Sequence, residues 1–235
     1  AVVVLLLILA PRAEETRMDE PASEDETVSS YPWLSTMYFA AGFVALGLEI
    51  VWLRFLGIVN SNSTVTFSLT LAFYLGGMGV GSLFLYRILR RYLAPYTIFA
   101  VANGGVAIAS LATYPVIYSA PYLNHEGIVM PSAAGTLTLS DLYQTEALSI
   151  FLLLFVPAVS MGLVYPAVCD SVSGRGRGRQ NWIASTYFLG TLGSVAGTLL
   201  VSLGMIPLLG LHMTFAVLVT VSAAICATSF AIAHK

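Results

Sequence analysis

Charged side chains are scarce in this sequence, and that scarcity excludes an ordinary soluble domain. The 235 residues include only 10 Lys and Arg and 12 Asp and Glu, or 9% charged residues. Soluble domains carry roughly 25%. So few charges cannot cover a core when 57% of the residues are hydrophobic. The net charge of −2 and the lack of a basic–aromatic stretch give no sign of nucleic-acid binding.

Cysteine and histidine are also rare, which argues against metal and redox chemistry. Cys169 and Cys226 form no CxxC pair, and His125, His212 and His234 share no metal-ligand spacing. His212 could cap a helix or reach a cofactor from the membrane boundary. We predict no metal site and no cofactor, and we expect the cysteines to act as small packing residues.

Long apolar runs are what the sequence does contain, and their length matches the roughly 20 residues needed to cross a bilayer. We therefore predict an all-α, polytopic transmembrane helix bundle of about six spans over residues 35–235. Before it come an apolar segment at 1–10, too short for a full span, and an acidic, flexible linker at 11–34. The expected spans are Ser35–Leu56, Val65–Tyr86, Tyr96–Tyr118, Ala147–Val168, Ile183–Gly204 and Leu211–Ala233.

The basic residues predict the orientation of this bundle. With six spans, one side holds the linker, two arginine loops and Lys235, and so every basic residue except Arg54. The other side has a long loop from about Ser119 to Glu146 that contains acids and no Lys or Arg. Basic loops stay cytoplasmic. We expect the inner (cytoplasmic) membrane, with both ends of the six-span domain in the cytoplasm.

Two glycine-rich runs lie in the second and fifth expected spans. Small residues four apart let helix backbones approach closely, which matters in lipid because packing holds helices together there. Neither run has the G-x-G-x-x-G spacing of a dinucleotide site. We interpret both as helix-packing surfaces; because each is the second of three spans, they also suggest two inverted three-helix units. The packing glycines are Gly76, Gly77, Gly79, Gly81, Gly190, Gly193 and Gly197.

Polar groups inside the spans are few: Glu49, Arg54 and Asn103. An intramembrane acid faces the bundle interior and suggests a functional site. Glu49 and Arg54 lie about 140° apart around a helix and are not expected to pair. Glu49 is expected to make a hydrogen bond to another helix, with cation or proton handling as the alternative. Arg54 can extend toward the headgroups.

An ordered set of motifs resembles a known family. These are the segments at 47–57, 73–82, 156–166, 187–197 and 206–210. Together they resemble the transmembrane domain of bacterial spermidine-synthase-like membrane proteins, in which helices precede a Rossmann-like aminopropyltransferase domain. The resemblance covers roughly residues 35–232 and implies no catalytic residue here, because no segment matches the catalytic domain.

Three functions remain open. The sequence favours a non-catalytic membrane subunit that packs in the lipid bilayer against other membrane protein subunits of a larger complex. One alternative is the membrane half of a spermidine-synthase-like enzyme whose soluble domain is absent. The other is a transporter of amines or polyamines that uses Glu49 and Asn103.

Overall fold

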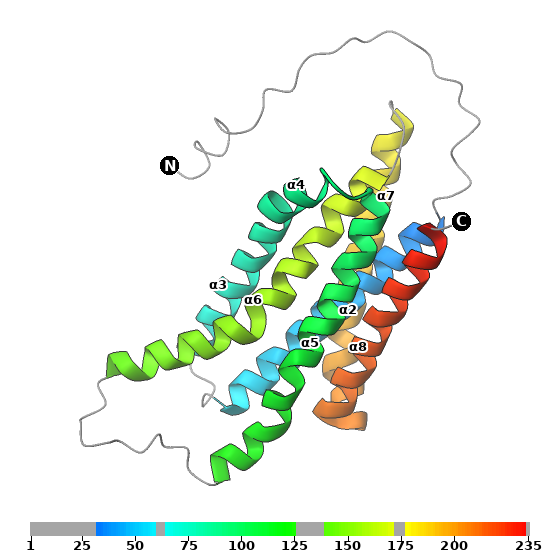
Figure 1. Cartoon of the computed structure of the whole chain (residues 1–235). Coiled ribbons are helices and arrows are strands. Elements are labelled where there is room, and N and C mark those ends of the chain that lie inside the picture. The colour runs from blue at the N-terminus through cyan, green and yellow to red at the C-terminus, as the bar shows by residue number, and fades with distance from the viewer. Residues whose placement is uncertain (1–31, 60–63, 126–138, 172–176, 234–235) are drawn as a thin grey trace.

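The computed structural model describes residues 32–59, 64–125, 139–171 and 177–233, and these are helical apart from short turns, with no strand among them. The all-α prediction is confirmed for this part of the chain. The predicted segment at 1–10 and most of the predicted linker at 11–34 lie outside the described residues, but residues 32–34 of that linker form the start of α2. The elements, drawn in Figure 1, are α2 (Pro32–Val59), α3 (Thr64–Val80), η2 (Gly81–Leu85), α4 (Tyr86–Leu89), α5 (Pro95–His125), α6 (Leu139–Ser171), α7 (Arg177–Leu200), η3 (Val201–Met205) and α8 (Ile206–Ala233).

Five helical segments of the described chain are long and apolar enough to cross a membrane: Trp33–Ile58, Thr64–Leu89, Pro95–Tyr114, Leu153–Ser171 and Asn181–Ile232. The last covers 52 residues. A straight helix of that length would measure about 78 Å, far more than the roughly 30 Å hydrocarbon core. The predicted count of six spans is not decided by this list and stays a prediction.

The long final segment is broken at Gly210. Its backbone is non-helical, with φ 79° and ψ 169° inside α8. A positive φ is tolerated by glycine because it has no Cβ. Figure 1 shows α7 and the main part of α8 running in opposite directions on the two sides of this break.

The expected long loop from Ser119 to Glu146 is shorter than predicted. Helix α5 continues to His125, and α6 already begins at Leu139. Hydropathy marks where a helix becomes polar, but a helix ends only where its backbone bonding stops, so these ends were underestimated. Residues 126–138, between the two helices, lie outside the described part of the chain.

Glycine contacts join two pairs of helices. A Cβ at Gly77 would lie 2.7 Å from the Cβ of Ala158, and one at Gly81 would collide with the Val159 carbonyl of α6. On α7, a Cβ at Gly193 or Gly197 would collide with a backbone carbonyl of α2. The α3–α6 and α2–α7 pairs therefore touch backbone to backbone.

The two pairings are reciprocal in sequence. Gly77 lies near the Phe155 carbonyl, and Gly193 lies near the Phe39 carbonyl. Gly193 lies as far beyond Gly77 as Phe155 lies beyond Phe39. The same offset relates Gly81 and Val159 to Gly197 and Phe43, so the first helix of each expected unit packs on the second helix of the other.

Helix α5 contributes buried side chains to the core of the bundle. It packs against α6 and α8, and Ile98 and Phe99 are fully buried in the same core as Trp52 of α2 and Phe215 of α8. By contrast, the span that contains α3 is only 22% buried, against 56% for that of α6. Helix α3 thus lies at the edge of the bundle, with one face uncovered by the described chain.

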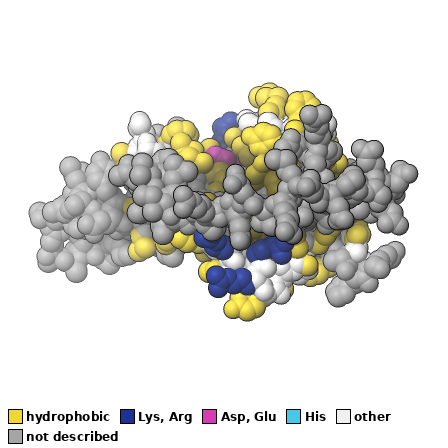
Figure 2. All heavy atoms as spheres, turned by 90° about the horizontal axis from the view of Figure 1, so that it is seen from above, with side chains coloured by type: hydrophobic (Ala, Val, Ile, Leu, Met, Phe, Trp, Pro, Cys, Tyr) yellow, Lys and Arg dark blue, Asp and Glu magenta, His cyan; other side chains and the backbone are white. Residues whose placement is uncertain are grey.

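The end of the bundle that bears α4 carries basic side chains. Figure 2 looks onto this end and shows several Lys and Arg side chains there. Arg87, Arg90 and Arg91 are exposed at or just after α4. The side chains of the second arginine loop lie outside the described residues. We call this end, predicted to face the cytoplasm, the inner end, and the opposite one the outer end.

Candidate functional site

A cavity of about 120 Å³ lies where the helices of the bundle meet. We call it the central cavity. Its walls come from α2, α3, α5, α6, α7 and α8, and they combine apolar side chains with hydroxyl, phenol and amide groups. The polar and aromatic lining residues are Tyr38, Tyr74, Asn103, Tyr165, Ser194 and Ser222. A cavity this size can hold a small solute.

Asn103 ties two helices together beside the central cavity. Its side chain is 3% exposed, and its amide nitrogen donates to the Phe99 carbonyl at 2.9 Å within α5. Its backbone carbonyl accepts a hydrogen bond from the Ser222 hydroxyl of α8, also at 2.9 Å. Asn103 therefore still has its side-chain carbonyl as an acceptor on the lining of the cavity.

Glu49 finds its partner on another helix. Its half-buried side chain lies within interaction range of the Tyr74 phenol of α3. The Tyr74 hydroxyl donates a hydrogen bond to the Met161 sulfur at 3.7 Å. Tyr74 is 3% exposed and lines the central cavity. The Tyr74 phenol therefore lies between Glu49 and the central cavity.

Three tyrosines add aromatic surface that the sequence had not singled out. The Tyr38 and Tyr165 ring centroids lie 6.4 Å apart, and those of Tyr165 and Tyr187 lie 5.8 Å apart. Tyr38 and Tyr165 both line the central cavity. They come from α2, α6 and α7, and no local spacing could have brought them together in advance.

Arg54 is separate from this group. It is exposed near the C-terminal end of α2 and lines a second, larger cavity of about 490 Å³, which we call the outer cavity. Glu49 and Arg54 form no ion pair, as their spacing predicts. Within the described ranges, the ion pair found joins Arg90 and Asp170.

The Arg90–Asp170 pair was missed by sequence reasoning. The Arg90 Nε lies 2.7 Å from an Asp170 oxygen, and the Tyr86 hydroxyl donates to the same oxygen at 2.5 Å. Asp170 is an acid at the end of an otherwise apolar span, which is the one local signal that could have marked it. It joins the inner ends of α3–α4 and α6.

The predicted packing glycines divide into two sets. Gly77, Gly81, Gly190, Gly193 and Gly197 lie against neighbouring helices of this chain. Gly76 and Gly79 have no atom within 4 Å of an added Cβ, so both face open space on α3.

Other reactive groups are dispersed. No group of three or more His, Cys, Asp or Glu that could hold a metal occurs among the residues placed by the structure. Cys169 and Cys226 lie on different helices and are not joined by a disulfide. The His212 ring packs edge-on against Tyr114 at 6.5 Å, on the bundle's own aromatic surface.

Comparison with known proteins found no matching protein family, no matching curated protein and no matching solved structure. The resemblance to spermidine-synthase-like membrane proteins therefore stays a prediction, as does the idea of a separate soluble enzyme domain. The arguments for function come from the geometry of the bundle.

Proposed function

We propose that this chain is a six-span inner-membrane protein that binds a small organic cation in the central cavity and transports it, without catalysing a reaction. The observation that carries the proposal is the proximity of Glu49 to Tyr74, because Tyr74 forms part of the cavity wall. A purely structural acid would need a partner, but it would not need one that lines a cavity at the junction of the helices.

Cationic ligands fit the chemistry of this cavity. Glu49 can supply a negative charge, and an intramembrane acid commonly marks an ion or substrate pathway. The faces of Tyr38, Tyr74 and Tyr165 attract cations through their π electrons. Asn103 and the two serines offer acceptors for N–H groups. Amines are also the substrates that the family resemblance implies.

The reciprocal glycine contacts support two inverted three-helix units, α2–α3–α5 and α6–α7–α8. Transporters are often built from such inverted repeats, with the binding site near the midplane at their interface. The turn positions agree: Gly210 lies as far beyond Gly193 as Ala94 lies beyond Gly77. Ala94 directly precedes α5, the third helix of the first unit. A reversal of the chain at Gly210 would likewise begin the third span of the second unit, and the bundle would then have six spans.

Uptake into proteoliposomes tests the function. We expect wild-type protein to accumulate radiolabelled putrescine, and Glu49→Gln to reduce uptake at least about tenfold, since a neutral amide cannot balance the ligand's charge. Glu26→Gln, an equivalent change in the acidic linker, is the matched control and should leave uptake unchanged. Wild-type vesicles that take up no more than empty ones would reject the proposal.

A second candidate is the non-catalytic subunit that the sequence favours. One observation supports it: the outward face of α3 leaves Gly76 and Gly79 in open space, beside the exposed side chains of Leu75 and Leu83. Another membrane helix could approach closely there. Gly76→Leu should then reduce the mass of the detergent-extracted complex to that of a single chain. An unchanged mass would exclude this surface as the contact.

A further inference from the structure

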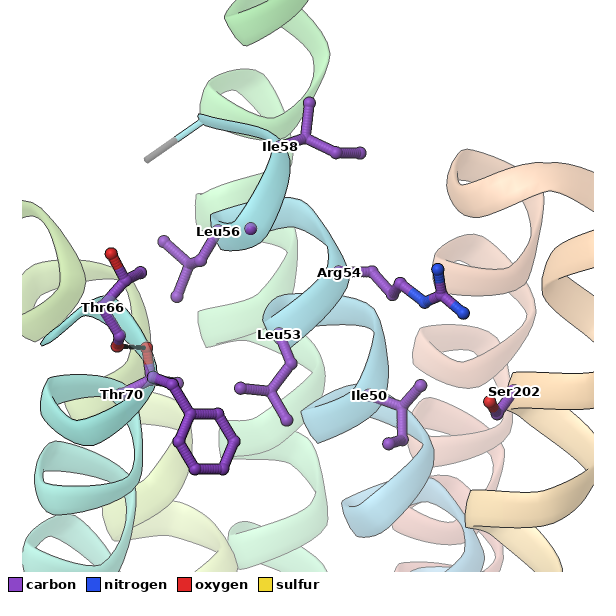
Figure 3. A pocket seen from close by; sticks show the side chains of 10 residues that line it. Ile50, Leu53, Arg54, Leu56, Ile58, Thr66, Thr70 and Ser202 are labelled. Carbon is purple, nitrogen blue, oxygen red and sulfur yellow. Dashed lines mark hydrogen bonds between the residues drawn. The ribbon is translucent and has the colours of Figure 1, made fainter. Parts of the chain in front are cut away.

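The outer cavity differs from the central one in being larger and in having a charged residue, Arg54, on its lining. Its volume of about 490 Å³ is enclosed by the last turns of α2, the first turns of α3 and Ser202 of η3 (Figure 3). Phe67 and Ile58, on its rim, are 55% and 66% exposed. The cavity therefore opens sideways, toward the lipid that surrounds a membrane-spanning bundle.

Arg54 brings the one charge to the described lining of this cavity. In Figure 3 its side chain reaches from α2 across the cavity toward Ser202. No ion pair involves Arg54 among the side chains that the structure describes. The nearest acid along the chain, Glu49, is engaged with Tyr74. The connecting residues 60–63 are Asn-Ser-Asn-Ser and contain no carboxylate.

An unpaired guanidinium at membrane depth is costly unless an anion neutralises it. The neutralising group must share the cavity with apolar side chains of α2 and α3. A free inorganic anion would satisfy the arginine but leave this apolar space to water. A phospholipid satisfies both, because its phosphate oxygens match the guanidinium fork and its acyl chain matches the walls.

We propose that the outer cavity is a binding site for one anionic phospholipid. The phosphate accepts hydrogen bonds from Arg54 and from the Ser202 hydroxyl. An acyl chain lies along Ile50, Leu53 and Phe67. The site is distinct from the central cavity, and it does not depend on transport.

Native mass spectrometry of the whole chain, extracted from nanodiscs of known composition, tests this site. With an equal mixture of phosphatidylglycerol and phosphatidylcholine, we expect one retained phosphatidylglycerol per chain. Arg54→Gln should lower its retention about tenfold, the effect of losing one charge-assisted contact of roughly 1.4 kcal/mol. Arg87→Gln, an exposed arginine at the inner end, is the matched control and should change nothing.

A second variant tests the apolar half of the site while keeping the charge. Phe67→Trp enlarges the side chain on the open rim and should weaken retention of the lipid with Arg54 intact. Equal retention of both lipids, or unchanged retention in Arg54→Gln, would overturn the proposal. So would displacement of phosphatidylglycerol by millimolar inorganic phosphate, which indicates a free-anion site. Higher retention after removing the acids Glu126, Asp141 and Glu146 together would show that one of these carboxylates pairs with Arg54 instead.

Discussion

The inner end of the α3–α6 pair and the outer end of the α2–α7 pair lie at equivalent positions of the two three-helix units. Each end has one charged residue, and the two charged residues have different surroundings. Asp170 lies as far beyond Phe155 as Arg54 lies beyond Phe39. At the inner end Asp170 accepts hydrogen bonds from Tyr86 and Arg90. At the outer end Arg54 faces a cavity.

The difference follows from the residues that meet the two charges. The position equivalent to Tyr86 is Ser202, whose side chain is too short to cross the same gap. The position equivalent to Arg90 is Ile206, which carries no charge to pair. One end thus satisfies its charged residue within the chain, and the other presents its charge to a ligand. Equivalent backbone packing does not impose equivalent chemistry at the two ends.

The sharpest test of this comparison is to determine which end of the bundle faces the cytoplasm. In a background with Cys169→Ser and Cys226→Ala, a cysteine at Ala134 should react with an impermeant thiol reagent applied to intact cells. One at Gly176 should not, because the arginine loops stay cytoplasmic. We expect all-or-none labelling. The reverse pattern would exchange the inner and outer ends, and labelling of both would exclude the six-span topology.

The glycine contacts should show the largest effect on stability. Gly77→Leu and Gly193→Leu each force a side chain against a facing helix, so each should destabilise the fold by about 3 kcal/mol or more. The matched control is Gly76→Leu on α3, which enters open space. Folded fractions measured during titration with a denaturing detergent give these values. Equal curves for Gly76→Leu and Gly77→Leu would contradict the packing of α3 on α6.

A smaller effect on stability is expected at the Arg90–Asp170 ion pair. Asp170→Asn removes the ion pair and weakens the Tyr86 hydrogen bond, but the Arg90 and Asp170 side chains are 47% and 37% exposed. Water screens such a pair, so we expect a loss of only about 1 kcal/mol in the same titration. Arg87→Gln should lose nothing measurable. A loss of stability above about 3 kcal/mol would contradict this estimate and would mean that the Arg90–Asp170 pair is a main contribution to the stability of the bundle.

The helices and the glycine contacts could be predicted because both are local patterns. Apolar run length predicts spans, and the predicted gap between Gly204 and Leu211 contains the break at Gly210. The partner of Glu49 could be predicted only as a residue of another helix. Tyr74, the tyrosine cluster and Asp170 with its partners depend on which helices become neighbours. A single sequence without periodicity does not specify that arrangement.

Equilibrium binding tests the central claim most directly. Purified chain in nanodiscs would be titrated with radiolabelled putrescine, as wild type, Glu49→Gln and Tyr74→Phe. We predict saturable binding of one molecule per wild-type chain, an affinity at least about tenfold lower in Glu49→Gln, and a smaller loss in Tyr74→Phe, which keeps the carboxylate and the ring face. Saturable binding that is equal in wild type and Glu49→Gln, or no saturable binding at all, would contradict a cation site at the centre of the bundle.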